Sequence, residues 1–445
     1  MGGNGRSAPA LSSLFNPMES SWKRTYWVVW TANLVTSIGM MSFLPFFPSL
    51  LAEMGVEGEE AISTWAGVCF AAAPLSATFS APVWGALGDR FGRKVMVCRA
   101  MLAIAVFVGG MGFVQTPLQL LCMRLGQGLF SGFIPPSITL VSIAAPENQQ
   151  GRVAGNLATA LAIGGLVGPM FGGFVATLLG SRQSVFFVVG TLALLSAALV
   201  WFGVEEDASK RRTSDGVPRG VAATLRTTAR DIREVLASPS LRAVVLVVFA
   251  MQFGLGSVNP VLELHVQSLF DGADLEGSTW QKLTGFFASK GTTLEERVQT
   301  LATSLLFGVM AVASLLALSP WGRYGDRVGH RRALVHCAII AVVALVVQAS
   351  TAHYGVLLFG RGMMGLAMAG IGPLAFGLAA GQASVDRRGG AFGVVFSSRT
   401  FAVAVGGSIG GLLSPLIGVR GVMLVSSVLL VSTIIVFREA KRPVA

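Results

Sequence analysis

The chain has 445 residues, of which 53% are hydrophobic and 12% are charged, and its mean hydropathy is +0.68. An ordinary soluble domain carries about 25% charged residues, so this composition excludes a soluble protein and predicts a lipid bilayer as the solvent. The net charge of +11 does not indicate a nucleic-acid partner, because Lys and Arg lie mostly at the ends of apolar runs.

Twelve apolar runs follow one another along the chain, and a helix of about 20 such residues crosses about 30 Å of hydrocarbon. The polar segment before them, residues 1–24, lacks the apolar core of a cleavable signal and is predicted to be a cytoplasmic tail. The predicted spans are residues 26–51, 65–87, 95–114, 117–144, 152–179, 184–203, 241–268, 299–321, 333–350, 354–383, 390–416 and 418–437.

The distribution of cations predicts the orientation. Most of the 33 Lys and Arg lie on the side of the N-terminus, and the opposite loops hold only Arg182, Lys282, Lys290, Arg297 and Arg420. Loops rich in Lys and Arg remain in the cytoplasm. We therefore expect a multi-pass protein of a bacterial inner membrane with both termini cytoplasmic.

A polar, basic segment divides the spans into two sets of six. Residues 205–240 are predicted to form a cytoplasmic linker, with a helix-compatible sequence towards its end. The linker separates an N-terminal six-helix bundle, residues 25–204, from a C-terminal bundle, residues 241–440.

A second polar segment, residues 271–297, is predicted to be an external insert. It holds two capping-box patterns, Ser278 with Gln281 and Thr293 with Glu296. These patterns predict a short external helix followed by an eighth span that begins early.

An internal repeat relates the two bundles. Each repeated residue lies 237 positions after its counterpart, as Asp326 lies after Asp89. Gly85, Asp89, Gly92, Arg124, Gly128 and Pro136 recur in this way as Gly322, Asp326, Gly329, Arg361, Gly365 and Pro373. The repeat predicts an all-α membrane protein of two pseudo-symmetric six-helix halves, a design in which transporters bind substrate near the midplane between repeats.

Several motifs resemble one family. The loop GALGDRFGRK, residues 85–94, and its copy GRYGDRVGHRR, residues 322–332, are similar to the signature of the major facilitator superfamily. Three further segments resemble motifs of its twelve-helix drug:proton antiporters: RLGQG at residues 124–128, GGLVGPMFGG at residues 164–173 and LPFFP at residues 44–48. The resemblance extends from about residue 25 to residue 440.

The resemblance implies the major facilitator fold and a multidrug-efflux type of transport. We expect export of small amphipathic molecules by alternating access in exchange for protons, with the proton gradient as the energy source and no cofactor or metal. The expected partners are a small-molecule substrate and the lipid bilayer, with the protein a monomer.

The resemblance also implies a conformational latch in the two repeated loops. A carboxylate such as Asp89 can pair with nearby cations and with a helix N-terminus, which would hold the outward-facing state. The alternative is a solvated loop that merely follows the charge rule. The predicted latch consists of Gly85, Asp89, Arg90, Gly92, Arg93, Lys94, Gly322, Asp326, Arg327, Gly329 and Arg331.

The fifth span carries the antiporter motif Gly164, Gly168, Pro169, Gly172 and Gly173. Glycines four residues apart form a smooth helix face that allows close packing, and the proline bends the helix. Close packing alone would explain this pattern. The resemblance implies further that the face slides against a helix of the second half and limits leak.

Arginines inside spans are the first candidates for coupling or substrate binding. A charge there costs a few kcal/mol unless it is paired or hydrated, so we expect Arg124 to face a polar cavity together with Gln127. A structural role, in which Arg124 caps carbonyls between helices, is the alternative. Arg361 is its repeat mate, but Met364 stands where the glutamine would be.

Glu263 is the one acidic residue well inside the predicted spans, and a group that binds and releases a proton is needed for antiport. His265 could take this role, or Glu263 could be an external loop residue. Asn33, Gln252 and Arg399 complete the predicted coupling or substrate cavity. With three intramembrane arginines we expect a net positive cavity, suited to anionic or amphipathic substrates.

Two other functions remain open. Uptake or facilitated diffusion of an anionic metabolite would use the same fold, and a non-transporting membrane sensor would keep only its architecture. An enzyme is not expected, because no catalytic triad, metal-ligand or phosphate-binding pattern is present.

Overall fold

The computed structural model describes residues 17–146, 150–206, 221–271, 278–285, 293–382 and 388–439. Within these ranges every regular element is a helix. Eleven helical segments there are long and apolar enough to cross a membrane, and the last, Gly390–Glu439, has 50 residues. Its backbone leaves the helical region at Gly418 (φ 69°, ψ 164°), so it holds the last two spans. The prediction of twelve spans is confirmed.

The elements fall into two sets that follow each other along the chain. The first half contains α1 (Pro17–Ser42), η2 (Leu44–Phe46), α2 (Phe47–Glu53), α3 (Glu59–Phe91), α4 (Arg93–Gly110), η3 (Met111–Phe113), α5 (Pro117–Phe130), α6 (Ile134–Ala144), α7 (Gln150–Leu179) and α8 (Gln183–Gly203). The second half contains α10 (Pro239–Val258), η6 (Asn259–Val261), α11 (Leu262–Phe270), α13 (Leu294–Val328), α14 (His330–Ala349), α15 (Tyr354–Gln382) and α16 (Arg388–Glu439). Between or beside them lie α9 (Val221–Ala237) and α12 (Thr279–Gly285).

Prolines explain where the spans break. Proline has no N–H to donate and its ring clashes with the preceding turn. The first span is therefore interrupted at η2, which contains Pro45, and the seventh at η6, which contains Pro260. The fourth span, predicted at residues 117–144, is found at Pro117–Ala144, but it is interrupted between α5 and α6, just before Pro135 and Pro136.

The polar segments contain the predicted short helices. In the linker, α9 begins at Val221. In the insert, Ser278 Oγ accepts from Gln281 N (3.3 Å) at the start of α12. The capping box of Thr293 and Glu296 begins α13, which confirms an early start for the eighth span. At the N-terminus α1 begins at Pro17, within the segment predicted as a cytoplasmic tail.

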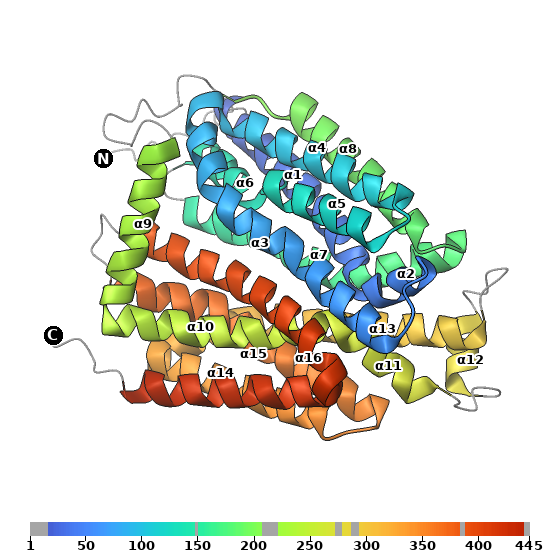
Figure 1. Ribbon diagram of the computed structural model, residues 1–445. Helices are drawn as coiled ribbons and strands as arrows, with labels where there is room; N and C mark the ends of the chain where they lie inside the picture. The colour runs from blue at the N-terminus through green and yellow to red at the C-terminus, as the bar shows by residue number, and fades with distance from the viewer. Residues whose placement is uncertain are drawn as a thin grey trace, which may run out of the picture.

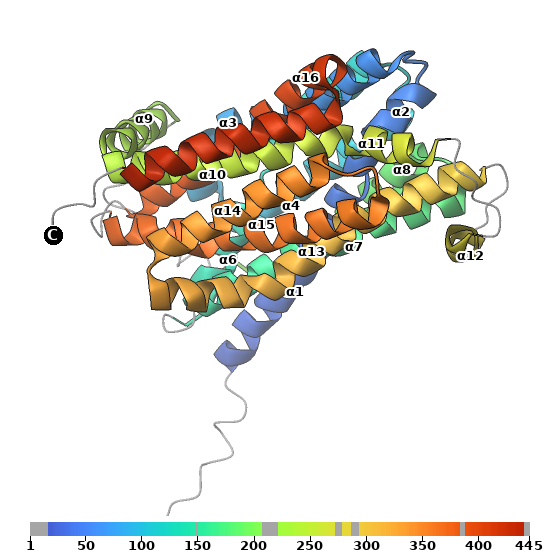
Figure 2. The same cartoon turned by 90° about the horizontal axis from the view of Figure 1, so that it is seen from below.

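Each half has its own hydrophobic core. One cluster of buried side chains comes from residues 29–204 and the other from residues 235–437. Figure 1 shows the blue-to-green helices of the first half above the yellow-to-red helices of the second. The helix α9 contacts α3, α10 and α16 at one end of the molecule, and α12 lies at the opposite end (Figures 1 and 2). We call these the linker end and the insert end.

The sequence repeat is also a structural repeat. Gly92 and Gly329 both have positive φ, 98° and 88°, a conformation that favours glycine, and each links two consecutive helices. Gly128 and Gly365 both lie so close to a neighbouring helix that an added Cβ atom would overlap a backbone carbonyl oxygen, of Ala73 or of Met310.

A pair of tryptophans extends the repeat to hydrogen bonds that were not predicted. Trp84 Nε1 donates to the carbonyl of Leu129 (2.5 Å), and Trp321 Nε1 donates to that of Leu366 (2.7 Å). Both the donors and the acceptors lie 237 positions apart. The two halves therefore hold their second and fourth spans together in the same way.

Candidate functional site

The described hydrogen bonds place the seven residues predicted for a coupling or substrate cavity in five separate groups. These groups are Asn33 with Ser137, Arg124 with Gln127, Gln252 with Arg399, Arg361 with Asn259, and Glu263 with Ser49.

Arg124 is held by protein atoms on all sides. Its Nε donates to the carbonyl of Cys69 (2.9 Å), Nη2 to that of Phe70 (3.1 Å) and Nη1 to Gln127 Oε1 (2.5 Å). The guanidinium also lies over the rings of two phenylalanines of the first span, and the residue is only 3% exposed. Its contacts match the structural alternative, in which it caps carbonyls between helices.

Pro74 explains why a carbonyl is free to bind Arg124. In an α-helix the carbonyl of residue 70 would accept from the N–H of residue 74, and proline has none. The carbonyl of Phe70 in α3 therefore needs another donor, which Arg124 of α5 supplies. The sequence signal was Pro74 in the second span, opposite an intramembrane arginine.

The amide of Gln127 faces the same way as Arg124, as predicted. Its Nε2 donates to Met40 Sδ (3.1 Å) of α1, so the group links three helices of the first half. Nearby on α1, Asn33 is fully buried, and its Oδ1 accepts from Ser137 Oγ (3.1 Å). Both polar groups stabilise packing within this half.

Arg361 occupies the matching position in the second half with fewer partners. Its Nη2 donates to Asn259 Oδ1 (2.9 Å), and its guanidinium lies over the ring of Phe307. Its Nε and Nη1 are buried and have no hydrogen-bond partner in the described chain. The residue is 0% exposed.

Gln252 and Arg399 form a pair between α10 and α16. With the amide oriented so that its oxygen faces the guanidinium, Gln252 accepts from Arg399 Nε (3.1 Å) and Nη2 (3.3 Å). Arg399 therefore contacts a side-chain amide and is partly exposed. The structure brings together two residues of the predicted cavity that lie 147 positions apart in the chain.

Glu263 lies at the contact between the halves near the insert end. It accepts from Ser49 N at Oε2 (3.1 Å) and from Ser49 Oγ at Oε1 (2.5 Å), and Gln267 Nε2 donates to the same Oγ (3.1 Å). Ser49 belongs to the first turn of α2, where backbone N–H groups lack helical partners. At 2% exposure Glu263 is not an exposed loop residue. His265, the alternative titrating group, is buried, and its Nε2 has no described partner.

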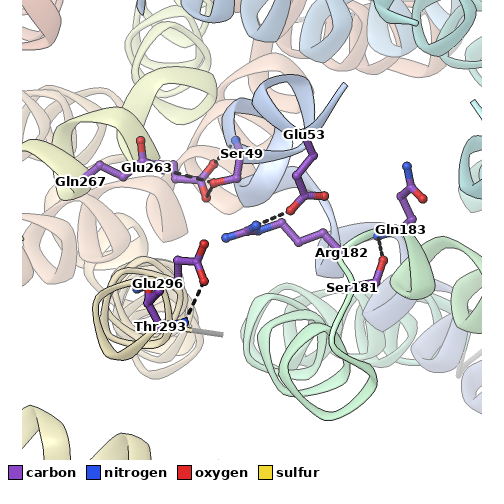
Figure 3. A network of polar contacts seen from close by, with 9 residues as sticks. All are labelled: Ser49, Glu53, Ser181, Arg182, Gln183, Glu263, Gln267, Thr293 and Glu296. Carbon is purple, nitrogen blue, oxygen red and sulfur yellow. Dashed lines mark hydrogen bonds and ion pairs between the residues drawn. The ribbon is translucent and has the colours of Figure 1, made fainter. Parts of the chain in front are cut away.

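An ion pair lies beside this contact. Arg182, between α7 and α8, pairs with Glu53 at the end of α2. Figure 3 shows Arg182 reaching towards Glu53, with Ser49 and Glu263 on the adjoining side and the first turn of α13 below. Ser49, Glu53 and Arg182 were not predicted as site residues, because each is an ordinary residue at a helix end in the sequence.

All described hydrogen bonds between the two halves lie towards the insert end. Besides Ser49 and Glu263, Ser63 Oγ donates to the carbonyl of Gly411 (2.9 Å). Here α3 and α16 touch backbone to backbone, since a Cβ atom on Gly411 would lie 2.7 Å from the Cα of Gly67. Ser304 Oγ of α13 donates to the carbonyl of Pro169 (3.2 Å). The structure is closed at the insert end by these contacts.

The glycine face of the fifth span packs differently from the prediction. Gly164, Gly168 and Gly172 face α1 of the same half, where an added Cβ would overlap residues 37–42. Only Gly173 of the motif faces α13 of the second half, next to Ser304. The prediction that the whole face slides against a second-half helix was wrong. Close packing within the half explains three of the four glycines.

The first loop motif is fixed by an acidic residue that was not predicted. Glu206 accepts from the backbone N–H groups of Arg93 (2.8 Å) and Lys94 (3.1 Å), at the start of α4. A carboxylate is favourable at a helix N-terminus. The surroundings of Gly85 and the side chains of Asp89 and Arg90 lie outside what the structure describes.

The second loop motif has its own contacts. Asp326 is 74% exposed at its side chain, and its Oδ1 lies 3.7 Å from His330 Nε2. Arg331 donates to the carbonyl of Phe437 and stacks on its ring, much as Lys94 lies over the ring of Trp201. Both loops are therefore tied to the last span of their own half. Gly322 and Arg327 lie at the linker end without a close neighbour that would define a role.

No group of three or more His, Cys, Asp or Glu side chains that could hold a metal ion occurs in the described part of the chain.

Known proteins resemble this chain over most of its length. Multidrug resistance protein MdtG of Proteus mirabilis is 28% identical over 361 residues, which is 79% of this chain and 80% of that protein. Multi-drug resistance efflux pump PmrA of Streptococcus pneumoniae is 30% identical over 325 residues, 73% of each chain.

Solved structures share the fold at low identity. The human organic anion transporter MFSD10 (TETRAN) has a TM-score of 0.65 at 19% identity, covering 94% of this chain and 99% of its own. The nucleoside transporter NupG has a TM-score of 0.70 at 12% identity, covering 93% and 98%.

The sequence profile of the Major Facilitator Superfamily matches residues 29–291 and 283–445, which together include all membrane spans. The fold, the duplicated halves and this match agree with the resemblance of the loop motifs. The chain belongs to the Major Facilitator Superfamily and is a membrane-embedded transporter, not an enzyme.

Proposed function

We propose that this transporter exports small amphipathic molecules by alternating access, in exchange for protons, as a monomer in the bacterial inner membrane. The observation that carries the proposal is the contact between Glu263 and Ser49. Glu263 is the one buried acidic side chain among the described residues, and both of its hydrogen-bond donors belong to the other half. Separation of the halves at the insert end therefore removes both donors at once.

The direction of transport is supported by charge and by relatives. The excess of Lys and Arg at the linker end favours a cytoplasmic position for that end, so the insert end faces outwards. The contacts at the insert end then close the outer side of the protein. Relatives named as multidrug resistance and efflux proteins, at 28–30% identity, favour export of small molecules.

The geometry of Glu263 accommodates a proton. If Oε1 is protonated, its O–H can donate to Ser49 Oγ across 2.5 Å, while Oε2 still accepts from Ser49 N. Burial of a carboxyl group costs less free energy when the group is neutral. Closure of the insert end is therefore easiest after Glu263 has taken up a proton from the outer side, which carries that proton inwards.

Return to the outward-open state completes the exchange. Loss of the proton towards the cytoplasm leaves a buried carboxylate, which favours separation of the halves and renewed hydration of Glu263. A substrate bound from the cytoplasm moves outwards in that step. Protons and substrate then cross in opposite directions, as antiport requires.

The test is transport by the purified protein in proteoliposomes with an imposed pH gradient. We expect a fluorescent amphipathic dye to move against its own gradient, opposite to the protons, and to stop when an ionophore collapses the gradient. Dye flux that does not depend on the pH gradient would indicate a facilitator instead. Absence of any flux, with the protein folded, would favour the sensor alternative.

A further inference from the structure

Arg124 and Arg361 occupy equivalent positions in the two halves but differ in their hydrogen bonds. All three nitrogens of Arg124 donate to protein oxygens. Arg361 donates from Nη2 alone, to Asn259, and its Nε and Nη1 are buried without a partner among the described residues. One arginine is satisfied by the fold, and the other is not.

Two substitutions between the repeats explain the difference. The position equivalent to Pro74 is Ala311, whose N–H can close the helical bond to the carbonyl of Phe307, so no carbonyl is released towards Arg361. The position equivalent to Gln127 is Met364, which offers no amide oxygen. The second half therefore lacks both the carbonyl that a proline would release and the glutamine amide oxygen, but it retains the arginine.

An unsatisfied arginine at this depth is costly. A charge within a membrane span costs a few kcal/mol or more unless it is paired or hydrated, and arginine keeps its charge in proteins. The described contacts of Arg361 are the neutral amide of Asn259 and the ring of Phe307. The buried acid Glu263 is occupied by Ser49. An anion supplied from outside the chain would satisfy the guanidinium.

We propose that Arg361 binds the anionic group of the transported molecule, whereas Arg124 is a structural residue. A guanidinium edge suits a carboxylate, because the two oxygens accept in parallel from Nη2 and from either Nε or Nη1 once the anion displaces the Asn259 amide. The ring of Phe307 provides an apolar surface beside the charge. The substrate class is therefore an amphipathic anion with a carboxylate or a similar group. This inference rests on the proposed export function and adds its substrate class.

Asn259 links Arg361 to the boundary of the halves and to Glu263. It is half-buried and belongs to η6, which contacts α3 and η2 of the first half, so it stands between Arg361 and the boundary of the halves. An anion that displaces the Asn259 amide frees η6. Glu263 lies four residues further on, directly after this break. Binding at Arg361 can thereby loosen the contact between Glu263 and Ser49.

The test compares two dyes of similar size, anionic carboxyfluorescein and cationic rhodamine 6G. Fluorescence anisotropy with the purified protein measures the affinity for each dye, and heating in detergent measures stability. We expect Arg361→Gln to shift the ratio of the two affinities at least tenfold towards rhodamine 6G without lowering thermal stability. Arg124→Gln should lower stability. Arg323→Gln, which removes an exposed charge of α13, serves as the matched control for net charge.

A carboxylate placed beside Arg361 provides the second test. Asn259→Asp supplies an internal anion, so we expect higher thermal stability and at least tenfold weaker binding of carboxyfluorescein. The proposal is overturned if carboxyfluorescein binds Arg361→Gln as tightly as the unaltered protein. It is also overturned if Arg361→Gln lowers thermal stability as Arg124→Gln does and lowers the affinities for both dyes equally. If the two dyes bind as proposed but neither is transported, the proposed export function is contradicted and the role of Arg361 in anion binding is not.

Discussion

Glu263 of α11 accepts two hydrogen bonds from Ser49 of α2, a residue 214 positions earlier in the chain. Both residues follow a proline-containing break, since Pro45 lies in η2 and Pro260 in η6. The breaks place the short helices α2 and α11 in contact across the boundary of the halves. The two prolines thus create the place where a buried acid can respond to opening and closing.

The close contact of α3 and α16 gives a prediction about the closed state. A Cβ atom on Gly411 would lie 2.6 Å from the carbonyl oxygen of Ser63 and 2.7 Å from the Cα of Gly67, closer than real contacts allow. Gly411→Ala should therefore open the insert end. We expect a cysteine at position 63, in a background without the four native cysteines, to react several-fold faster with a membrane-impermeant maleimide.

The matched control for this prediction is Gly393→Ala. Gly393 lies in the same helix and has no atom within 4 Å of an added Cβ. This variant should label like the parent. Equal labelling of the two glycine variants would mean that the backbone contact does not hold the insert end closed.

The carboxylate of Glu206 gives a prediction about the first loop motif. It binds two N–H groups at the start of α4, and loss of such a cap costs about 1 kcal/mol. Glu206→Ala should lower thermal stability and speed backbone hydrogen exchange at residues 92–96. Glu205→Ala removes the neighbouring exposed carboxylate and should change neither quantity. If both variants behave alike, net charge rather than capping is responsible.

The paired tryptophans give a prediction about the repeat. Trp84→Phe and Trp321→Phe each remove one hydrogen bond to a carbonyl, worth about 1 kcal/mol. The two changes lie in different halves, so their effects on stability should add. Chemical unfolding of the two single variants and the double variant measures this. A double variant no less stable than either single one would show that the two bonds are not independent.

Much of the fold follows from the sequence because membrane spans depend on local composition. A run of about 20 apolar residues is sufficient evidence for a helix in lipid, and the displacement of 237 from Asp89 to Asp326 identifies the duplication. Gly92 and Gly329 both have positive φ, a conformation that favours glycine, and this explains why glycine occurs at both repeated positions. The break between α5 and α6 was missed, although Pro135 and Pro136 signalled it.

The candidate site was less predictable because it depends on contacts between distant segments. Glu263 was identified as an intramembrane acid, but nothing local in the sequence indicates Ser49 as its partner. Gly67 of α3 and Gly411 of α16 meet across the boundary of the halves, whereas in the fifth-span motif only Gly173 faces the opposite half. The spacing of glycines predicts a close approach and does not identify the helix that approaches.

The roles of the two repeated arginines also depend on tertiary contacts. Arg124 is satisfied by a carbonyl that Pro74 releases on another helix, and that relationship becomes visible only when the two helices are placed side by side. The sequence did show that Met364 replaces a glutamine near Arg361. Its consequence, an arginine with unfilled donors, required the structure.

The most direct test of the account is substrate-driven proton movement in the Glu263→Gln variant. Glutamine can keep both contacts to Ser49 but cannot exchange a proton, so it imitates the protonated acid. In proteoliposomes that contain a pH-sensitive dye, the unaltered protein should move protons opposite to the transported molecule. The variant should bind that molecule and move no protons with it. Proton movement by Glu263→Gln equal to that of the unaltered protein would contradict the account.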